Sequence, residues 1–268
     1  MRPKRSLGQN FLTNPHVVNK IIEFADVGQR DCVLEIGPGR GIMTTALARV
    51  AARVVAVEKD DDLAETLAAE YAHDPRIRIV HGDILELNLE TLAPAGAKLV
   101  ANLPYNIATA VILRLVELPK HFTSVTVMVQ KEVALRICAD KGTRDYAGLS
   151  VLVGVNFTTV PGFLVGPGNF SPRPKIDSMV IKLIGREETM APDDLRHLKT
   201  VVFGAFGQRR KMLRNSWINL PGMSGELLNK LALEAGIDLG RRPQDLTIED
   251  FKRFSRLYRS MEQCDAAP

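Results

Sequence analysis

Short apolar runs alternate with helical patterns along the first half of the chain, and this alternation restricts the fold more than any other feature. The runs have the length and β-branched content of buried strands, and they lie at residues 32–36, 53–58, 77–80, 98–101 and 124–129. The helical patterns between them cover residues 41–51, 60–71 and 108–118. Because strands that alternate with helices form parallel sheets covered on both faces, we predict an α/β fold.

The next part of the chain changes character. Residues 149–159 and 178–184 are both rich in β-formers, with no strong helical pattern between them. We expect them to form an antiparallel pair at one edge of the sheet. The intervening residues 161–177 are rich in Pro and Gly and predict a long loop. Long loops on compact domains often carry function.

The sequence pattern predicts helices in the C-terminal third of the chain. A polar linker at residues 185–191 precedes helical patterns at 192–215, 224–235 and 247–261. The last of these begins with Thr247 followed three residues later by Asp250, a variant of the capping box with Asp in place of Glu. We therefore predict a larger domain at residues 1–185 and a small helical domain at residues 186–268.

Composition excludes several classes of protein. The chain has 268 residues, of which 46% are hydrophobic, enough for a substantial core. It has no apolar run of membrane-spanning length, and no apolar segment follows the basic N-terminus as in a secretory signal. Three distant cysteines (Cys32, Cys138 and Cys264) are typical of a reduced compartment, so we expect a cytoplasmic protein. The five histidines have no metal-ligand spacing, and we predict no metal site.

A glycine-rich turn, EIGPGRG, follows the first predicted strand. Gly37, Gly39 and Gly41 allow a sharp turn and close approach of the backbone to a ligand. A dinucleotide-binding turn places its third small residue one position later, where this chain has Ile42. The spacing therefore disfavours NAD.

Three further polar positions follow the ends of other predicted strands. Glu58 lies about 20 residues beyond the glycine turn, where an acid binds ribose hydroxyls. Asp83, in HGDIL, is suited to accept a hydrogen bond from an adenine amine. The segment NLPYNI begins at Asn102; alone it predicts only a tight turn with a half-buried tyrosine. Since ligands of open α/β sheets bind at the carboxyl ends of the strands, we expect an adenosine-containing ligand there.

Seven motifs in order carry a family resemblance. They are LGQNFL (from Leu7), EIGPGRG, VEKD (from Val57), GDIL, NLPYNI, NFSPRPKIDSMV (from Asn169) and FGQRRKMLRN (from Phe206). Over nearly its whole length the chain resembles the bacterial KsgA-type small-subunit ribosomal RNA adenine dimethyltransferases, which use S-adenosyl-L-methionine. The resemblance implies a Rossmann-like methyltransferase domain with a mostly parallel seven-stranded sheet, followed by a helical domain that recognises RNA.

The resemblance also implies roles for individual residues. Those expected to bind S-adenosylmethionine are Asn10, Leu12, Gly37, Gly39, Glu58, Asp83 and Asn102. The adenine amine is a poor nucleophile because its lone pair is delocalised into the ring. Acceptors on the Asn102 side chain and the Leu103 carbonyl would draw the nitrogen toward tetrahedral geometry, with the carbonyl aimed by Pro104.

Two aromatic residues complete this predicted site. Tyr105 would stack on one face of a base flipped out of its helix. Phe170, in the predicted loop, would clamp the other face, although it is also suited to fill the core beneath that loop. No nucleophile on the protein is needed, because the methyl transfer is an in-line displacement that depends on positioning and electrostatics.

RNA binding is expected to depend on basic clusters, since the formal net charge of +4 is mild. Arg209, Arg210, Lys211 and Arg214 fall in one predicted helical stretch and are expected to face phosphates. Other basic clusters lie at Arg2 to Arg5, at Arg173 and Lys175, at Arg241 and Arg242, and at Lys252 to Arg259.

The implied substrate is a pair of adjacent adenosines in a hairpin near the 3′ end of small-subunit (16S) RNA, and we expect a monomer bound to the small ribosomal subunit. Three alternatives stay open. The resistance-conferring large-subunit (23S) rRNA methyltransferases share the catalytic motifs, although SLGQNFL and FGQRRKMLRN resemble the small-subunit branch more. An assembly or transcription factor with little catalysis would not need the Asn102, Tyr105, Glu58 and Asp83 set. A DNA adenine methyltransferase is disfavoured by the resemblance in the helical domain.

Overall fold

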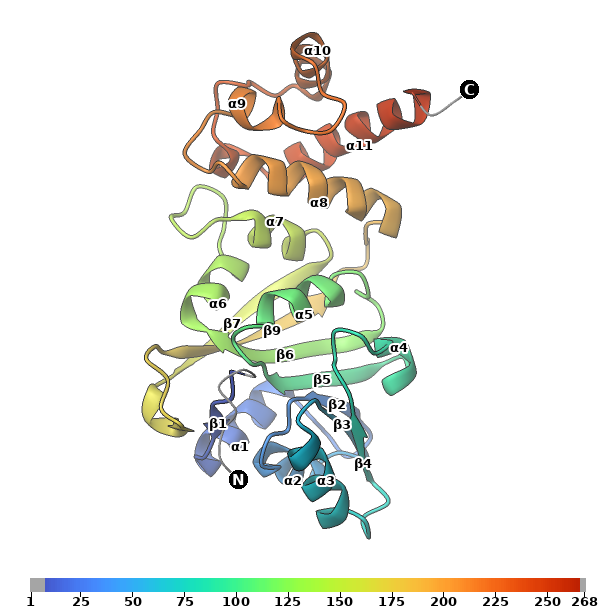
Figure 1. The fold of residues 1–268 in the computed structure, drawn as a ribbon, viewed down its shortest axis with the longest axis vertical. Coiled ribbons are helices and arrows are strands. Elements are labelled where there is room, and N and C mark those ends of the chain that lie inside the picture. The colour runs from blue at the N-terminus through green and yellow to red at the C-terminus, as the bar shows by residue number, and fades with distance from the viewer. Residues whose placement is uncertain (1–7, 266–268) are drawn as a thin grey trace. The chain divides into compact units, whose positions relative to one another are not determined.

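The computed structural model describes residues 8–265 of the chain, with side chains to Met261, so the predicted basic cluster at Arg2 to Arg5 and the Leu7 start of LGQNFL lie outside the described residues. The chain divides into two compact units. The first comprises residues 1–134 and 157–186, and the second comprises residues 135–156 and 187–268. Figure 1 shows the elements of each.

The first unit contains the strands and the helices that cover them. Its strands are β1 (Phe11–Leu12), β2 (Cys32–Ile36), β3 (Arg53–Glu58), β4 (Ile77–His81), β5 (Ala97–Asn102), β6 (Phe122–Gln130), β7 (Phe157–Val165), β8 (Phe170–Ser171) and β9 (Ser178–Gly185). Its helices are α1 (Pro15–Ala25), α2 (Ile42–Ala48), α3 (Asp61–Glu70), α4 (Leu89–Leu92), α5 (Ala108–Leu115) and the 3-10 turn η2 (Pro167–Asn169). Helix α6 (Lys131–Ile137) crosses from the first unit into the second.

Seven of these strands form one sheet in the order β4-β3-β2-β5-β6-β9-β7. The five strands from β4 to β6 are parallel, whereas β9 pairs antiparallel with both β6 and β7. The predicted α/β class, the mostly parallel seven-stranded sheet and the antiparallel edge are therefore confirmed. Because the chain runs outward from β2 in both directions, right-handed crossovers place α2 and α5 on opposite faces.

One face of the sheet is buried beneath α1 and α2. Val33, Val54 and Val100 project from neighbouring strands into a cluster with Ile21 of α1 and Leu47 of α2. Helix α1 starts at Pro15 after Asn14, whose side chain accepts a hydrogen bond from the His16 N–H. Asn followed by Pro is a helix-start signal that the sequence contains, but our sequence analysis did not use it.

The predicted strand at residues 149–159 is wrong. Helix α7 (Gly148–Gly154) occupies most of it, and β7 begins only at Phe157. Val151, Leu152 and Val153 are fully buried, so the burial of this apolar stretch outweighs the β preference of its valines. The predicted loop at 161–177 is also too long, because β7 continues to Val165 and β8 follows at Phe170.

The second unit is helical. Besides α7 it contains α8 (Pro192–Phe206), α9 (Leu213–Trp217), α10 (Gly225–Ala235), the 3-10 turn η3 (Pro243–Asp245) and α11 (Ile248–Asp265). The predicted cap of α11 is confirmed, because the Thr247 N–H donates to Asp250 Oδ2 at 2.8 Å and the Asp250 N–H donates to Thr247 Oγ1 at 3.0 Å. Trp217 stacks on Phe254 with 3.9 Å between ring centroids, which ties α9 to α11.

Our predicted boundary at residue 185 lies next to residue 186, where the chain leaves the first unit for the last time. The earlier excursion of the chain into the second unit was not predicted. Residues 135–156 belong to the helical unit, although we assigned them to the larger domain. Tyr146 explains why, because its hydroxyl donates to the Leu246 carbonyl at 3.1 Å and its ring packs edge-on against Phe206. Contacts of this kind over a separation of 100 residues leave no pattern in a single sequence.

Within the described residues, every helix is too short or too polar to cross a membrane. The same residues contain no group of three or more His, Cys, Asp or Glu side chains placed to hold a metal ion.

Candidate active site

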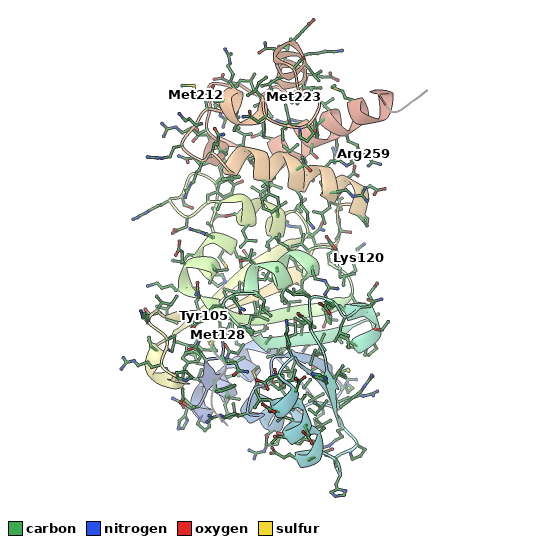
Figure 2. All side chains as sticks on the ribbon, viewed as in Figure 1. Tyr105, Lys120, Met128, Met212, Met223 and Arg259 are labelled. Carbon is green, nitrogen blue, oxygen red and sulfur yellow. The ribbon has the colours of Figure 1, made fainter. Side chains whose placement is uncertain are left out.

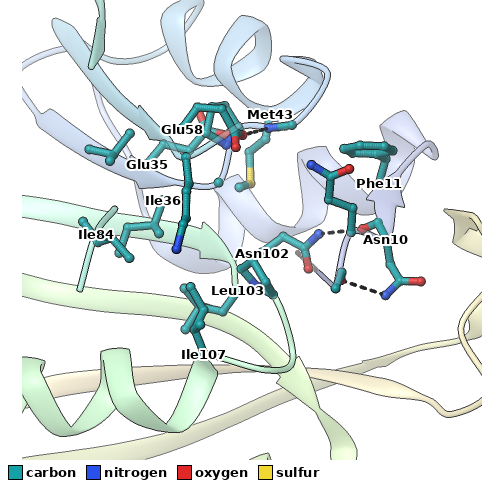
Figure 3. A pocket seen from close by; sticks show the side chains of 18 of the residues that line it. Asn10, Phe11, Glu35, Ile36, Met43, Glu58, Ile84, Asn102, Leu103 and Ile107 are labelled. Carbon is teal, nitrogen blue, oxygen red and sulfur yellow. Dashed lines mark hydrogen bonds between the residues drawn. The ribbon is translucent and has the colours of Figure 1, made fainter. Parts of the chain in front are cut away.

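A cavity opens in the first unit at the carboxyl ends of four parallel strands. The strand order reverses between β2 and β5, and in open α/β sheets this is where ligands bind. Figure 3 shows side chains from several segments converging on the cavity. Of the predicted site residues, the following line it: Asn10, Leu12, Gly37, Gly39, Glu58, Asp83, Asn102, Leu103, Pro104 and Tyr105.

The glycine turn after β2 forms one wall of the cavity. Gly39 has a φ of +59°, and a Cβ there would lie 2.8 Å from the ring of Phe11. Any side chain at this position would therefore collide with the N-terminal segment as well as strain the backbone. The prediction of a close backbone approach is consistent with this geometry.

Glu58 holds the glycine turn in place. Its Oε2 accepts from the Gly39 N–H at 3.1 Å, and its Oε1 accepts from the Asp60 N–H at 2.9 Å. Burial raises the pKa of this carboxyl, and the backbone donors act in the opposite direction. The structure thus gives the predicted ribose acceptor a second task, which is to join β2 and β3 at the rim of the cavity.

Asp83 is oriented by Lys59. The Lys59 ammonium lies 2.5 Å from Asp83 Oδ2, and Asp83 Oδ1 accepts from the Leu85 N–H at 2.9 Å. The hydrogen bond from Lys59 is the largest cause that lowers the pKa of Asp83, which keeps this carboxylate ionised as an acceptor. The position of Asp83 at the rim was predicted, whereas the role of Lys59, one residue after the end of the neighbouring strand, was not.

Glu35 is a cavity residue that sequence analysis missed as an individual side chain. It is fully buried at the end of β2, and its Oε2 accepts from the Thr44 hydroxyl at 2.7 Å. Its Oε1 has no hydrogen-bond partner among the described residues. Burial, followed by the influence of Glu58, raises the pKa of Glu35 to about 8. The sequence could have indicated this residue, because an acidic side chain inside a predicted buried strand is costly unless it has a function or a partner.

Hydrogen bonds hold Asn102, the last residue of β5, and the two residues that follow it. The Asn102 side-chain Nδ2 donates to the Asn10 carbonyl oxygen at 3.3 Å, as the dashed line in Figure 3 marks. This fixes the amide so that its carbonyl oxygen is the atom left to accept from a ligand. The Leu103 N–H donates to the Met128 carbonyl at 3.1 Å, and the Leu103 side chain is buried. The Pro104 carbonyl accepts from the Ala108 N–H at 3.1 Å, where α5 begins.

Tyr105 is half-buried at the same rim. Its hydroxyl lies 2.7 Å from the Ser178 hydroxyl at the start of β9, and burial raises the pKa of the phenol. Because Ser178 pairs with Gln130, this contact places the Tyr105 hydroxyl near the end of β6; Figure 2 labels Tyr105 on the fold. Tyr105 was predicted at this site from the sequence, but Ser178 was not.

The N-terminal segment covers part of the cavity. Strand β1 pairs with β8 through Phe11 to Ser171 and Leu12 to Phe170. Gln9 Nε2 donates to Asp60 Oδ2 at 2.9 Å, and the Arg40 guanidinium lies 4.9 Å from the centre of the Phe11 ring. These contacts bring residues 8–12 over the glycine turn, so the prediction that Asn10 and Leu12 line the pocket agrees with their positions.

Phe170 does not lie in the cavity. Its side chain is 5% exposed and belongs to the core cluster that also contains Leu12, Met128 and Val180. In this structure Phe170 thus fills the core beneath its loop, the alternative that its position also allowed, and the clamp on a flipped base stays a prediction. The pairing of β8 with β1 turns this residue inward, and sequence analysis did not foresee that pairing.

The four predicted RNA-binding residues lie in the second unit but not in one helix, because Arg209, Arg210 and Lys211 lie in a turn and Arg214 lies in α9. Helix α8 ends at Phe206 because the chain turns at Gly207, and α9 begins at Leu213. Arg210, Lys211 and Arg214 are exposed, whereas Arg209 is half-buried and donates to the Arg144 carbonyl.

A second segment extends this group of charges. The Leu213 N–H donates to the Arg241 carbonyl at 2.9 Å, and the Arg214 N–H donates to the Leu239 carbonyl at 3.1 Å. The exposed Arg242 therefore belongs to the same region. We define the basic cluster as Arg144, Arg209, Arg210, Lys211, Arg214 and Arg242. Three separate segments supply it, which the sequence clusters did not reveal.

Comparisons with known proteins agree with one another. A family model described as ribosomal RNA adenine dimethylase matches residues 1–259. A protein named ribosomal RNA small subunit methyltransferase A from Geobacter metallireducens is 41% identical, and the match covers 96% of this chain and 95% of that protein. The protein of the same name from Brucella anthropi is also 41% identical, with 98% and 94% covered.

Two solved structures cover nearly all of the chain. A dimethyladenosine transferase from Plasmodium falciparum has a TM-score of 0.77 at 23% identity, covering 94% of this chain and 98% of that one. The 23S rRNA methyltransferase ErmE has a TM-score of 0.66 at 26% identity, covering 92% and 99%. At 23% identity, the similarity to the Plasmodium protein supports the fold alone.

Proposed function

This chain belongs to the ribosomal RNA adenine dimethylase family, and we propose that its cavity holds S-adenosylmethionine and an adenine base of small-subunit RNA next to each other. It is an S-adenosylmethionine-dependent enzyme that dimethylates adenosine of small-subunit ribosomal RNA. Its proposed target is two adjacent adenosines in a hairpin near the 3′ end of that RNA. The observation that carries the proposed roles is the hydrogen bond from Asn102 to Asn10, which leaves the Asn102 carbonyl oxygen as an acceptor.

The cavity residues suit an adenosine-containing cation. Glu58 would accept from the ribose hydroxyls, and the ionised Asp83 would accept from the adenine amine. Glu35 presents a buried carboxyl oxygen that has no partner among the described residues, so a cationic group in the cavity would satisfy it. Gly37 and Gly39 allow the backbone to approach the ligand, beside Asn10 and Leu12.

When bound, S-adenosylmethionine supplies an electrophilic methyl group on a sulfonium. The protein prepares the adenine N6 amine for it. The Asn102 Oδ1 and the Leu103 carbonyl oxygen accept the two amine hydrogens, and this releases the lone pair from the ring. Pro104 restricts the backbone that carries the Leu103 carbonyl. These acceptors are in place before the substrate arrives, so they contribute without reorganisation during the reaction.

Tyr105 holds the base. Its ring stacks on the adenine face, which stabilises the base outside its helix. Phe170 remains the proposed contact for the second face of the base, because Leu12 of the same core cluster also lines the cavity.

The basic cluster of the second unit binds the RNA backbone. Arg210, Lys211, Arg214 and Arg242 are exposed and contact phosphates, which gives affinity without reading sequence. The partner is the small ribosomal subunit, and this substrate places the reaction in the cytoplasm. We also propose that the enzyme acts as a monomer.

The direct test uses labelled S-adenosylmethionine with small or large ribosomal subunits that lack the modification. Digestion of the RNA to nucleosides should yield labelled N6,N6-dimethyladenosine from the small subunit only, mapped to the 3′ hairpin. Asn102→Ala protein serves as the background control. Label confined to large-subunit RNA would instead support the resistance-type alternative.

A further inference from the structure

A hydroxyl pair joins the rim of the cavity to the antiparallel edge of the sheet. The Tyr105 hydroxyl lies 2.7 Å from Ser178 Oγ, although the two residues are 73 positions apart. Tyr105 follows β5, whereas Ser178 is the first residue of β9. Nothing in the proposed function so far requires Ser178.

Ser178 lies at a rigid point of the fold. Its backbone pairs with Gln130 of β6 on one side and with Val165 of β7 on the other, and its side chain is fully buried. One residue earlier, the Asp177 carbonyl accepts from the Lys131 N–H at 3.0 Å. A hydroxyl held by strands on both sides has little freedom to move.

Tyr105 lacks comparable support from its own segment. The hydrogen bonds of Asn102 and Leu103 fix the two residues that would accept the amine, but they do not reach the tyrosine ring. A half-buried tyrosine needs a partner for its hydroxyl, and Ser178 supplies it. Burial raises the pKa of Tyr105, so the phenol keeps its proton at neutral pH.

We propose that Ser178 is a positioning residue that sets the plane of the Tyr105 ring before the base arrives. This inference rests on the proposed stacking role of Tyr105. Without the hydroxyl pair the ring would be free to rotate, and a flipped base would spend less time in the reactive orientation. RNA affinity comes mainly from phosphate contacts of the other unit, so the loss should fall on kcat and leave KM for the ribosomal subunit almost unchanged.

The test is a double-mutant cycle with Ser178→Ala and Tyr105→Phe, which removes one hydroxyl at a time and keeps the aromatic ring. Each single variant should lower kcat about tenfold, the effect of losing one hydrogen bond in the reactive state. Because both changes break the same contact, the double variant should also be about tenfold slower and not a hundredfold. Affinity for S-adenosylhomocysteine, measured by calorimetry, should be unchanged in all three.

The matched control is Thr126→Val on β6. Thr126 is as fully buried as Ser178, and its hydroxyl has no hydrogen-bond partner among the described residues. Its loss should leave kcat unchanged, so a fall in kcat in the Ser178 variant cannot be assigned to the general loss of a buried hydroxyl from this sheet.

Tyr105→Ala separates the two levels of the proposal. If it lowers kcat strongly while Ser178→Ala and Tyr105→Phe are like wild type, the positioning role is wrong and the stacking role stands. If Tyr105→Ala is also like wild type, the stacking role fails first. Additive losses in the double variant, or a loss confined to KM, would overturn the inference about Ser178. Should Ser178→Ala not fold, the Tyr105→Phe arm still measures the contact from the other side.

Discussion

The side-chain amide of Asn102 donates a hydrogen bond to the backbone carbonyl of Asn10, across 92 positions of sequence. Asn10 belongs to the segment that closes over the glycine turn, and Asn102 ends β5. The two sides of the cavity are therefore joined at the residue proposed to accept the substrate amine. Ordering of the N-terminal segment and orientation of the Asn102 amide are linked.

Asn102→Ala should lower turnover on the order of 10²–10³, because it removes one preorganised polar contact to the reacting amine. The thermal midpoint should change little, since Asn102 is only partly buried. Single-turnover methylation of unmodified small subunits measures the effect. The comparison is Asn19→Ala, an exposed amide on α1 that does not line the cavity, which should keep near wild-type turnover. Equal turnover in the two variants would remove Asn102 from the mechanism.

Gly39→Ala should weaken binding of S-adenosylhomocysteine by tenfold or more. The added Cβ would lie 2.8 Å from the Phe11 ring and would push the N-terminal segment away from the cavity. Gly96→Ala is the control that has backbone strain without a steric clash. Gly96 also has a positive φ, but no atom lies within 4 Å of an added Cβ. Its cost should be about 1–2 kcal/mol of stability, with ligand affinity intact. Calorimetric titration and chemical unfolding of both variants provide the two readouts.

The strands of the parallel sheet and the residues at their ends could be predicted from local pattern. Glu58, Asp83 and Asn102 each follow an apolar run, and the geometry of parallel sheets then brings them together. The sequence information needed to predict each of these positions lies within about ten residues of it.

Contacts between distant segments could not be predicted in this way. Phe170 is turned into the core by the pairing of β8 with β1, and neither two-residue strand leaves a periodic pattern. Ser178 acquires its partner from a residue 73 positions away. Helix α7 is valine-rich, and only its burial against other segments decides that it is not a strand.

Glu35 should make stability depend on pH between its unfolded and folded pKa values. Burial raises its pKa from 4.5 to about 8, so the folded protein binds the proton more tightly than the unfolded chain does. The stabilisation of the protonated form is fully present below pH 4.5 and is lost as pH rises toward 8. Glu35→Gln keeps the shape and removes the titration. From pH 5.5 to 8.5, the wild type should lose stability relative to this variant by up to about 1.4 kcal/mol per pH unit. Parallel urea-unfolding curves with no pH-dependent difference would contradict the assignment.

Asp83→Asn should weaken S-adenosylhomocysteine binding about tenfold, because it replaces a charged acceptor by a neutral amide and breaks the ion pair with Lys59. Asp61→Asn provides the matched control. Asp61 also has a side-chain partner, His81 Nε2 at 2.7 Å, but its side chain is 84% exposed and does not line the cavity. Calorimetry of both variants at one ionic strength measures the difference. Equal affinities would show that Asp83 makes no contact with the adenine amine.

Replacing Arg210 and Lys211 together by Ala should weaken binding to small subunits and flatten its salt dependence. Each phosphate contact that is lost lowers the slope of log K against log salt by about 0.7–0.9, so the pair should lower it by roughly 1.4–1.8. Arg196→Ala combined with Lys230→Ala is the control, because both residues are exposed and basic in the same unit but lie outside the basic cluster. Filter binding from 50 to about 200 mM salt covers the range in which counterion release dominates. A slope that falls equally in both double variants would mean that the loss reflects overall charge, and the basic cluster would then not be the RNA-binding surface.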